Sequence, residues 1–255
     1  MKKLILVLGI LVAAVGFAAA QEYKVAKNTG RLQIYLGKVT VEGTTGNEIV
    51  FTSTDHDHEK DDRAKGLTAV NGSGLEDNTG LGVNVQDKGG VIEVHQLKKM
   101  NSPNVKILVP KGVIVAYEHE SQYGGEAKFR NLENELEISA NYNSVELENV
   151  SGPMTVKSVY GHVEADFNSN IKGPISIVSV YGYVDVTLPL ATKCDIKMST
   201  SYGEIYAAQE FKIEYEKTSD NKFIRYDDRV NGKINGGGMK IDLNSNYGKI
   251  YLRKK

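Results

Sequence analysis

Apolar and polar residues alternate along many short stretches of this chain, and glycine, asparagine and proline separate the stretches. Alternation with a period of two is the pattern of a β-strand that buries one face. In the C-terminal half, the alternation resumes on both sides of a tyrosine that is followed by glycine or asparagine. The six tyrosines in this setting are Tyr123, Tyr142, Tyr160, Tyr181, Tyr202 and Tyr247.

The segments around these tyrosines form an internal repeat. The steps between them are 18 to 21 residues, and the last step, of 45 residues, is roughly two repeats. A small residue lies two positions before each tyrosine, as at Ser158 and Ser179. Mostly apolar residues lie four and six positions before it and three and five positions after it. Because glycine and asparagine tolerate positive φ, we expect a sharp corner at each tyrosine with a short strand on either side.

These two-strand rungs of about 20 residues predict an all-β fold, a single-domain β-solenoid. One rung cannot bury its apolar face, whereas stacked rungs share a continuous core, with strands about 4.8 Å apart. An antiparallel sandwich would also alternate, but it would not place the same residue types at the same offset six times.

The Tyr123 copy departs from the pattern. Tyr117 and His119 take the apolar positions before the tyrosine. Gly124 and Gly125 add one residue after it, which shifts the inward pair to Ala127 and Phe129. An insertion that contains glycine and reverses the facing of a strand predicts a β-bulge.

The other parts of the chain fit around the repeats. Residues 55–80 are polar and rich in glycine, and predict a long loop. The first strands are expected to cap one end of the solenoid, while Arg253, Lys254 and Lys255 put charge on the last strand at the other end. We therefore expect one domain over residues 21–255, with first strands, long loop and hairpins over 21–118 and tyrosine rungs over 119–255. Strands are predicted at residues 31–36, 38–42, 48–54, 81–86, 91–96, 105–109 and 113–117, the 81–86 and 91–96 pair forming a hairpin; a second hairpin, of 211–215 and 222–226, is predicted where one repeat is missing.

Residues 1–20 have the pattern of a cleaved signal peptide. Lys2 and Lys3 precede an apolar run over 4–17, and three alanines end at residue 20. The run is short for a membrane span, and no positively charged flank follows it. We expect an exported protein, in the periplasm or at the cell surface or outside the cell, without an integral membrane span in its mature chain.

Composition removes several classes of function. The chain has 31 Lys and Arg against 32 Asp and Glu, a net charge of −1, which excludes a basic nucleic-acid binder. A hydrophobic content of 40% with 25% charged residues excludes disorder as the main state. The single cysteine, Cys194, excludes an internal disulfide, and it shares an alternating face with Ile196 and Met198, which predicts burial.

Three groups of motifs carry a resemblance to a known family. They are the Gly-Lys-Val-Thr-Val-Glu-Gly stretch at 37–43, the Tyr-Gly rungs, and the closing Asn-Gly-Gly-Gly at 235–238 with Asn-Tyr-Gly-Lys-Ile-Tyr-Leu at 246–252. The chain resembles the bacterial putative-adhesin family of exported β-solenoid proteins over nearly all of its length after residue 20. The resemblance implies a β-solenoid fold and an envelope location, and supplies no catalytic residues and no cofactor.

The tyrosines are the first candidate site. A column of stacked corners would place Tyr160, Tyr181 and Tyr202 in an aromatic strip that binds sugar rings or another protein. Tyr183 and Tyr206, together with Tyr251, point outward in the alternation and would extend that surface. The alternative is that each ring packs over the corner glycine of the next rung and only stabilises the stack.

The second candidate is a metal site in the stretch Asp55 to Glu59. On a strand, His56 and His58 would share one face, with Asp57 on the other, and the two imidazoles would need a third ligand from elsewhere. The alternative is a solvated polar loop after a strand.

The third candidate is an acidic column four residues after the tyrosines. If the rungs align, three outward carboxylates stack at the spacing of the strands, a geometry that suits a retaining glycosidase or Ca²⁺. The alternative is an exposed face neutralised by basic neighbours. The carboxylates are Glu146, Glu164 and Asp185, and the expected neighbours are His162, Lys157 and Lys172.

The sequence thus favours a non-enzymatic, adhesin-like binding or scaffold protein of the cell envelope, with a glycan or a protein as its partner and no catalytic residues. One alternative is a polysaccharide-active β-helix enzyme that uses the stacked carboxylates. The other is a periplasmic metal-binding protein that uses His56 and His58.

Overall fold

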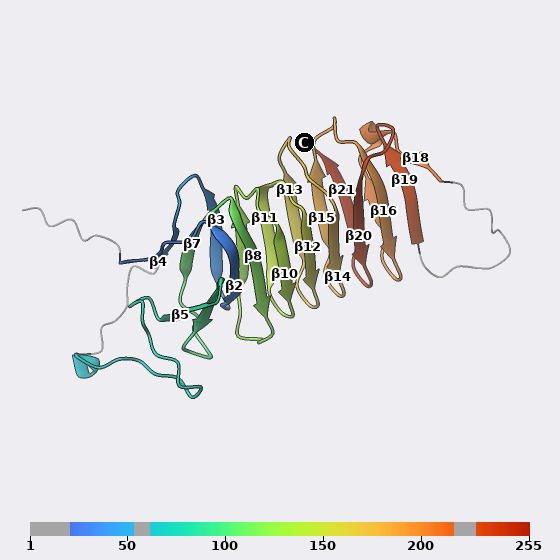
Figure 1. Ribbon diagram of the computed structural model, residues 1–255. Helices are drawn as coiled ribbons and strands as arrows, with labels where there is room; N and C mark the ends of the chain where they lie inside the picture. Colours follow the sequence, from blue (N-terminus) through green and yellow to red (C-terminus); the bar gives the residue numbers. More distant parts are fainter. Residues whose placement is uncertain (1–20, 54–61, 217–227) are drawn as a thin grey trace, which may run out of the picture.

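The computed structural model describes residues 21–53, 62–216 and 228–255, which form an elongated stack of strands (Figure 1). The predicted signal peptide, residues 1–20, lies outside the described residues, as does the predicted strand at 222–226. Two short 3-10 helices, η1 (Asp62–Ala64) and η2 (Gln209–Phe211), are the only helical segments within the described ranges.

The strands form two sheets that face each other across the core. Sheet A has ten strands, in the spatial order β1 (Glu22–Val25), β4 (Ile49–Ser53), β7 (Val105–Pro110), β3 (Val39–Thr44), β9 (Glu126–Arg130), β11 (Ser144–Val150), β13 (Val163–Phe167), β15 (Val184–Leu188), β21 (Ile250–Lys254) and β17 (Ile205–Ala207). Sheet B has eleven, in the order β18 (Glu214–Tyr215), β19 (Asp228–Ile234), β16 (Cys194–Thr200), β20 (Met239–Ser245), β14 (Ile175–Ser179), β12 (Met154–Ser158), β10 (Leu136–Ala140), β8 (Gly112–His119), β2 (Thr29–Tyr35), β6 (Val91–Gln96) and β5 (Val83–Lys88).

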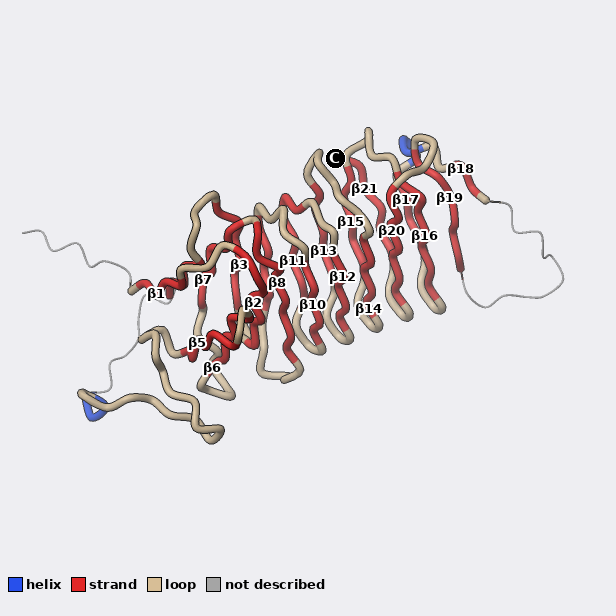
Figure 2. The backbone as a smooth tube through the Cα atoms, viewed as in Figure 1, coloured by secondary structure: helices blue, strands red, loops and turns tan. Residues whose placement is uncertain are grey.

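Each rung runs from a strand of sheet B, around a corner, to a strand of sheet A (Figure 2). Strands of successive rungs pair in parallel and in register, so that Val163 pairs with Val145 on one side and Val184 on the other. The inward positions of the alternation fill one continuous core of Val, Ile, Leu and Phe side chains, among them Phe129 and Phe167. The predicted all-β solenoid is confirmed.

The rungs do not stack in chain order. The rung β2–β3 lies between β6–β7 and β8–β9, because β2 pairs in parallel with both β6 and β8. The last rung, β20–β21, lies between β14–β15 and β16–β17 (Figure 1). The chain enters β20 through Asn235 to Gly238, four consecutive residues with positive φ, a conformation that glycine adopts without steric cost. The 45-residue step is therefore not a missing repeat, since Tyr247 belongs between Tyr181 and Tyr202.

Antiparallel strands cover the ends of the stack. β5 pairs with β6 as the predicted hairpin, and β4 and then β1 continue sheet A beyond β7. At the other end, β19 pairs with β16, and β18 pairs with β19. The prediction for 211–215 is wrong in part, because Phe211 ends a 3-10 helix and only Glu214–Tyr215 is a strand. The charged end of β21 does not protect an edge either, since β17 lies outside it.

The corner after β8 differs from the later corners. His119 pairs with Ala140, so it occupies the small-residue position that the alignment on Tyr123 assigned to Ser121. From His119 to Ala127 the chain advances eight residues, where Ala140 to Val145 takes five. The inward pair Ala127 and Phe129 is buried as predicted, but the longer corner displaces Tyr123 from the column.

Candidate functional site: the tyrosine ladder

Five of the six tyrosines stack on one another along one edge of the solenoid. In spatial order the rings are Tyr142, Tyr160, Tyr181, Tyr247 and Tyr202, which we call the tyrosine ladder. Neighbouring ring centroids are 4.9 to 5.0 Å apart, and the ring planes differ by 2° to 15°. Tyr123 makes no ring contact within the described part of the chain. Because the rungs pair in register, the strand spacing sets the ring spacing.

Buried hydroxyls hold each corner on the inner side of the ladder. Ser179 Oγ donates a hydrogen bond to the carbonyl oxygen of Gly161 at 2.9 Å, and Ser245 Oγ donates to that of Gly182 at 2.8 Å. Ser158 donates to Asn143 in the same way, and Thr200 to Gly248, each at 3.2 Å. The small residue before four of the five tyrosines is thus a hydrogen-bond donor to the neighbouring rung, and Ala140 before Tyr142 is the exception.

The corner glycines serve close packing and not positive φ, which corrects the expectation from sequence. Gly161, Gly182, Gly203 and Gly248 are absent from the residues with positive φ. A Cβ added to Gly182 would overlap the carbonyl oxygen of Gly161, and one added to Gly248 would overlap that of Gly182. Backbone approaches backbone at each of these four corners, and only glycine leaves room for it.

The ladder presents ring edges and hydroxyl groups to solvent. Parallel neighbours cover the faces of the inner rings, yet Tyr160 is 55% exposed and Tyr181 is 51% exposed. Of the two terminal rings, Tyr202 is 75% exposed and Tyr142 is 47% exposed. None of the five hydroxyls forms a hydrogen bond with a residue in the described ranges. The ladder is therefore a row of evenly spaced hydrogen-bonding groups on an aromatic base.

Tyr183 and Tyr206 lie in a separate row on the outer face of sheet A. Tyr183 stacks on His162 at 4.6 Å and meets Tyr251 edge-on at 6.2 Å, while Tyr206 stacks on Tyr251 at 5.5 Å. Their hydroxyls are occupied, since Tyr183 donates to Glu164 at 2.5 Å and Tyr206 donates to Glu204 at 2.8 Å.

Both bonds affect ionisation. Burial, and then the contact with Glu164, raises the pKa of Tyr183 to about 12. The bond to Glu204 raises the pKa of Tyr206. The predicted binding set thus divides, with Tyr160, Tyr181 and Tyr202 in the ladder and the other two engaged in contacts with carboxylates.

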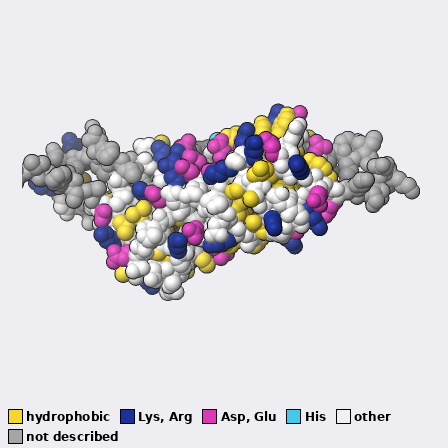
Figure 3. Space-filling view, turned by 90° about the horizontal axis from the view of Figure 1, so that it is seen from above, with side chains coloured by type: hydrophobic (Ala, Val, Ile, Leu, Met, Phe, Trp, Pro, Cys, Tyr) yellow, Lys and Arg dark blue, Asp and Glu magenta, His cyan; other side chains and the backbone are white. Residues whose placement is uncertain are grey.

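The acidic column aligns as expected, with Glu164 paired to Glu146 and to Asp185 on the adjacent strands. It lines a shallow groove of about 410 Å³. Each carboxylate has a partner: Glu146 contacts Lys128 at 3.0 Å, Asp185 contacts Arg253 at 2.7 Å, and Glu164 accepts the Tyr183 hydroxyl and lies 3.9 Å from His162. Of the neighbours named from sequence, Lys157 lies on sheet B and Lys172 contacts Glu133, so only His162 is correct. Basic and acidic side chains are likewise interspersed over the face in Figure 3.

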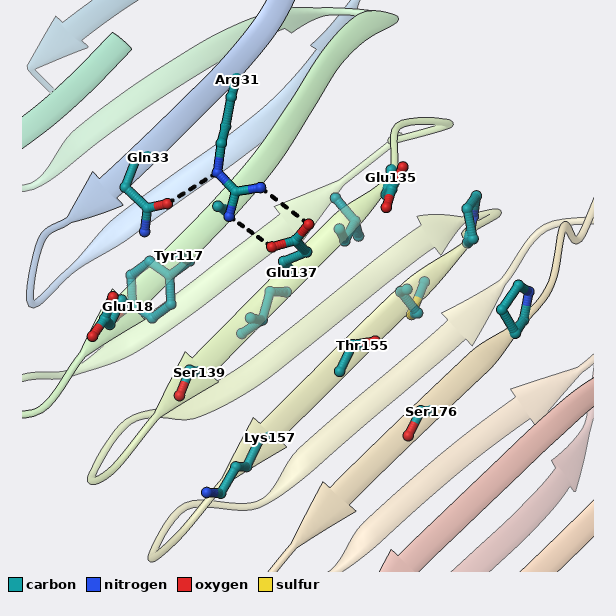
Figure 4. A pocket seen from close by; sticks show the side chains of 16 residues that line it. Arg31, Gln33, Tyr117, Glu118, Glu135, Glu137, Ser139, Thr155, Lys157 and Ser176 are labelled. Carbon is teal, nitrogen blue, oxygen red and sulfur yellow. Dashed lines mark hydrogen bonds and ion pairs between the residues drawn. The ribbon is translucent and has the colours of Figure 1, made fainter. Parts of the chain in front are cut away.

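A groove on the outer face of sheet B has a volume of about 620 Å³ (Figure 4). Arg31 closes it on one side through a two-pronged contact with Glu137, at 2.6 and 3.0 Å, and a bond to Gln33. Its floor crosses neighbouring strands through small polar side chains such as Thr155 and Ser176. None of the five ladder tyrosines is among the residues that line this groove.

The predicted metal ligands His56, Asp57 and His58 lie outside the described residues. No cluster of three His, Cys, Asp or Glu that could hold a metal ion occurs among residues 21–53, 62–216 and 228–255. Cys194 is buried as predicted, and burial raises the pKa of its thiol to about 12. In those same ranges, no helix has the length and apolar character needed to cross a membrane.

Fold and site together define a parallel β-solenoid with one exposed aromatic edge. Residues 125–253 match the family described as Toastrack DUF4097, which is just over half of the chain, and the protein belongs to this family. The resemblance stated from sequence is confirmed. The family match begins at Gly125, within the longer corner after β8, and covers the whole ladder.

Two solved structures are similar to the chain. One is named a "putative cell adhesion protein" from Clostridium sporogenes, with a TM-score of 0.47 and 14% identity, covering 92% of this chain and 100% of that one. The other is named a "putative adhesin" from Bacteroides fragilis, with a TM-score of 0.34 and 12% identity, covering 92% of this chain and 96% of that one. No curated protein matches the chain.

Proposed function

We propose that this chain is a non-enzymatic, adhesin-like binding protein, exported to the bacterial cell envelope, which holds an extended polymer along the tyrosine ladder. The single observation that carries the proposal is the row of five stacked, half-exposed tyrosines whose hydroxyls have no partner among the described residues. A flat, repetitive edge of a solenoid suits a repetitive ligand. In this proposal residues 1–20 are the export signal and residues 21–255 form one binding domain.

The acidic column supports binding better than catalysis. A retaining glycosidase needs two carboxyl groups about 5 Å apart, of which one is free to donate a proton to the leaving group. Here the basic groups Lys128 and Arg253 hold the two outer carboxylates, and Glu164 is engaged by the Tyr183 hydroxyl. The three residues repeat with the strands, and they do not converge on one point as an acid/base pair does.

Retention on immobilised polysaccharide from a bacterial envelope tests the proposal. The triple variant Tyr160→Ala/Tyr181→Ala/Tyr202→Ala should lose at least about tenfold in affinity, since each exposed anchor contributes about 1 kcal/mol. The matched control is Tyr123→Ala, which removes a tyrosine of the same repeat that stands outside the ladder, and it should bind as the wild type does. Equal retention of the triple variant and the wild type would refute the proposal.

A further inference from the structure

The shape of the ladder selects a linear ligand. It is one side chain wide and extends over four ring-to-ring steps of 4.9 to 5.0 Å. A stable protein–protein interface buries about 800 Å² on each partner and needs a broader patch. A chain-like molecule needs only a narrow track, and it gains affinity by repeating one weak contact on every rung.

The spacing of the ladder discriminates among linear polymers. An extended peptide advances about 3.3 Å per residue, and each strand of B-DNA advances about 3.4 Å per nucleotide, so neither keeps step with the rings. One sugar unit of an extended β-1,4-linked hexopyranose chain advances by nearly the distance between two rings. Such a chain can place one unit beside each rung over the whole ladder.

The orientation of the rings determines the kind of contact. Since neighbouring rings cover each other's faces, a sugar cannot lie flat on Tyr160, Tyr181 or Tyr247. The hydroxyls are the groups that reach solvent, and each can both donate and accept a hydrogen bond. The contact is therefore hydroxyl to hydroxyl, repeated on every rung, and it depends on the phenolic oxygen as well as on the ring.

The flanks of the ladder select an uncharged polymer. On the sheet B side, the residues directly before the five tyrosines are neutral; in spatial order they are Asn141, Val159, Val180, Asn246 and Ser201. On the sheet A side stands the acidic column, in which Glu164 has no Lys or Arg partner among the described residues and disfavours a polyanion. The partners Lys128 and Arg253 already neutralise its outer members, which leaves little attraction for a polycation.

We infer that the ladder binds a neutral, extended, β-1,4-linked glycan with one sugar unit beside each rung, held by the phenolic hydroxyls. This inference rests on the proposed function and adds the class of ligand to it.

Calorimetric titration of the full chain with cello-oligosaccharides and chito-oligosaccharides, from dimer to hexamer, tests the inference. Affinity should rise with each added unit up to the pentamer and then level off, because the ladder has five rings. The variant Tyr160→Phe/Tyr181→Phe keeps the stacked rings and removes two hydroxyls, so it should bind about tenfold more weakly at unchanged thermal stability. Tyr206→Phe, whose hydroxyl is already bound to Glu204, is the matched control and should leave affinity unchanged.

Further arms separate the inference from the proposed function. Polygalacturonate should bind at least tenfold more weakly than the neutral chains, and chitosan no more tightly than they do. Affinity that is independent of length, or equal in the Phe double variant and the wild type, overturns the inference. So does tighter binding of either charged polymer. If no neutral oligosaccharide binds, but the alanine triple variant still binds envelope polysaccharide more weakly than the wild type does, the inference fails and the proposed function stands.

A last arm addresses a second copy of the chain. Sedimentation should show no dimer that depends on the ladder. A dimer that the alanine triple variant abolishes would assign the ladder to self-association and overturn both statements.

Discussion

At both ends of the solenoid, the first or last rung of the chain lies inside a neighbouring rung. At the N-terminal end the first rung, β2–β3, lies inside β6–β7, and at the C-terminal end the last rung, β20–β21, lies inside β16–β17. Each of these rungs therefore pairs with neighbours on both sides in both sheets. A rung that is paired on two sides in both sheets cannot fray without breaking four strand contacts, so the interleaving stabilises the first and the last rung.

The ends differ in how they treat the outermost edges. The N-terminal end covers both sheets, with β5 on sheet B and with β4 and β1 on sheet A. The C-terminal end covers sheet B with β19 and β18, whereas sheet A ends at β17, which has three residues. A short edge strand offers few free backbone groups to another chain. The N-terminal end thus protects both sheet edges with additional strands. At the C-terminal end, the edge of sheet A is protected because its last strand, β17, is short.

Deleting residues 239–255 should reduce stability the most. These residues are last in the chain, but they form the rung β20–β21, which lies inside the stack. The deletion takes away four fully buried aliphatic side chains, each contributing about 1.5–3 kcal/mol, so about 6 kcal/mol or more is lost. Hydrogen exchange should show loss of protection throughout β16, β17 and β19, with β8 to β15 still protected. The four side chains are Ile241, Leu243, Ile250 and Leu252.

The matched control is a chain that begins at Asn28. It lacks β1, which is the outermost strand and pairs only with β4. Its loss of protection should stay within β4 and the adjoining residues. If the C-terminal deletion leaves β16 fully protected, the rung β16–β17 has moved onto β14–β15 in chain order, and the interleaved order is not required for stability.

Substituting one corner glycine at each end should distinguish the two ends, with a smaller loss of stability than the deletion causes. In Gly248→Ala the new Cβ overlaps the backbone carbonyl oxygen of Gly182. Since the Cβ position is fixed by the backbone of residue 248, neither atom can move aside without a backbone shift, and we expect a loss of about 2–3 kcal/mol. In Gly37→Ala at the N-terminal end, the nearest atoms are the Ser102 Cβ and the Tyr123 carbonyl oxygen, both at 3.1 Å, and we expect less than about 1 kcal/mol. Chemical denaturation of both variants measures the difference. Equal losses would show that the C-terminal corners are no more tightly packed.

The repeat could be predicted because its signals are local. Alternation around Tyr160 or Tyr181 fixes which side chains face inward, and the same offsets in successive copies fix the register between rungs. The order of the rungs could not be predicted in this way. Tyr247 fits beside Tyr181 and beside Tyr202 equally well by pattern, and only packing of the whole chain places it between them.

The candidate site was predicted in part for a similar reason. The column of tyrosines follows from the repeat, but Tyr142 and Tyr247 were not named as binding residues, although their offsets already marked them. Tyr183 and Tyr206 are separate from the ladder because they lie after the corner, on the sheet A side. The displacement of Tyr123 depends on the length of one corner, which alternation alone does not reveal.

Acidification should reveal a difference along the inner column of the corners. Toward the C-terminal end this column carries hydroxyls, whereas His119 fills the equivalent position near the N-terminal end. Burial lowers the pKa of His119, and the neighbouring Asn143 offsets only part of this. The unfolded chain then binds a proton more readily than the folded one, so stability is complete above about pH 6.5 and falls as the pH drops, by at most about 1.4 kcal/mol per unit.

His119→Leu should flatten this dependence between pH 7 and pH 5 when stability is measured by urea denaturation at each pH. The same slope in the variant and the wild type would mean that another group, and not this histidine, carries the dependence.

The smallest expected effect concerns the hydroxyls themselves. Ser179→Ala removes a buried donor to the Gly161 carbonyl oxygen in the middle of the column, and a hydrogen bond of this kind contributes about 1 kcal/mol. The column already contains its own control, since Ala140 occupies the equivalent position one rung from His119 and donates no bond. Ala140→Ser should therefore regain part of what Ser179→Ala loses, if the hydroxyl reaches the carbonyl of the longer corner. Urea denaturation of the two variants, alone and combined, gives both values, and an unchanged midpoint for Ser179→Ala would show that the column packs without the help of its hydroxyls.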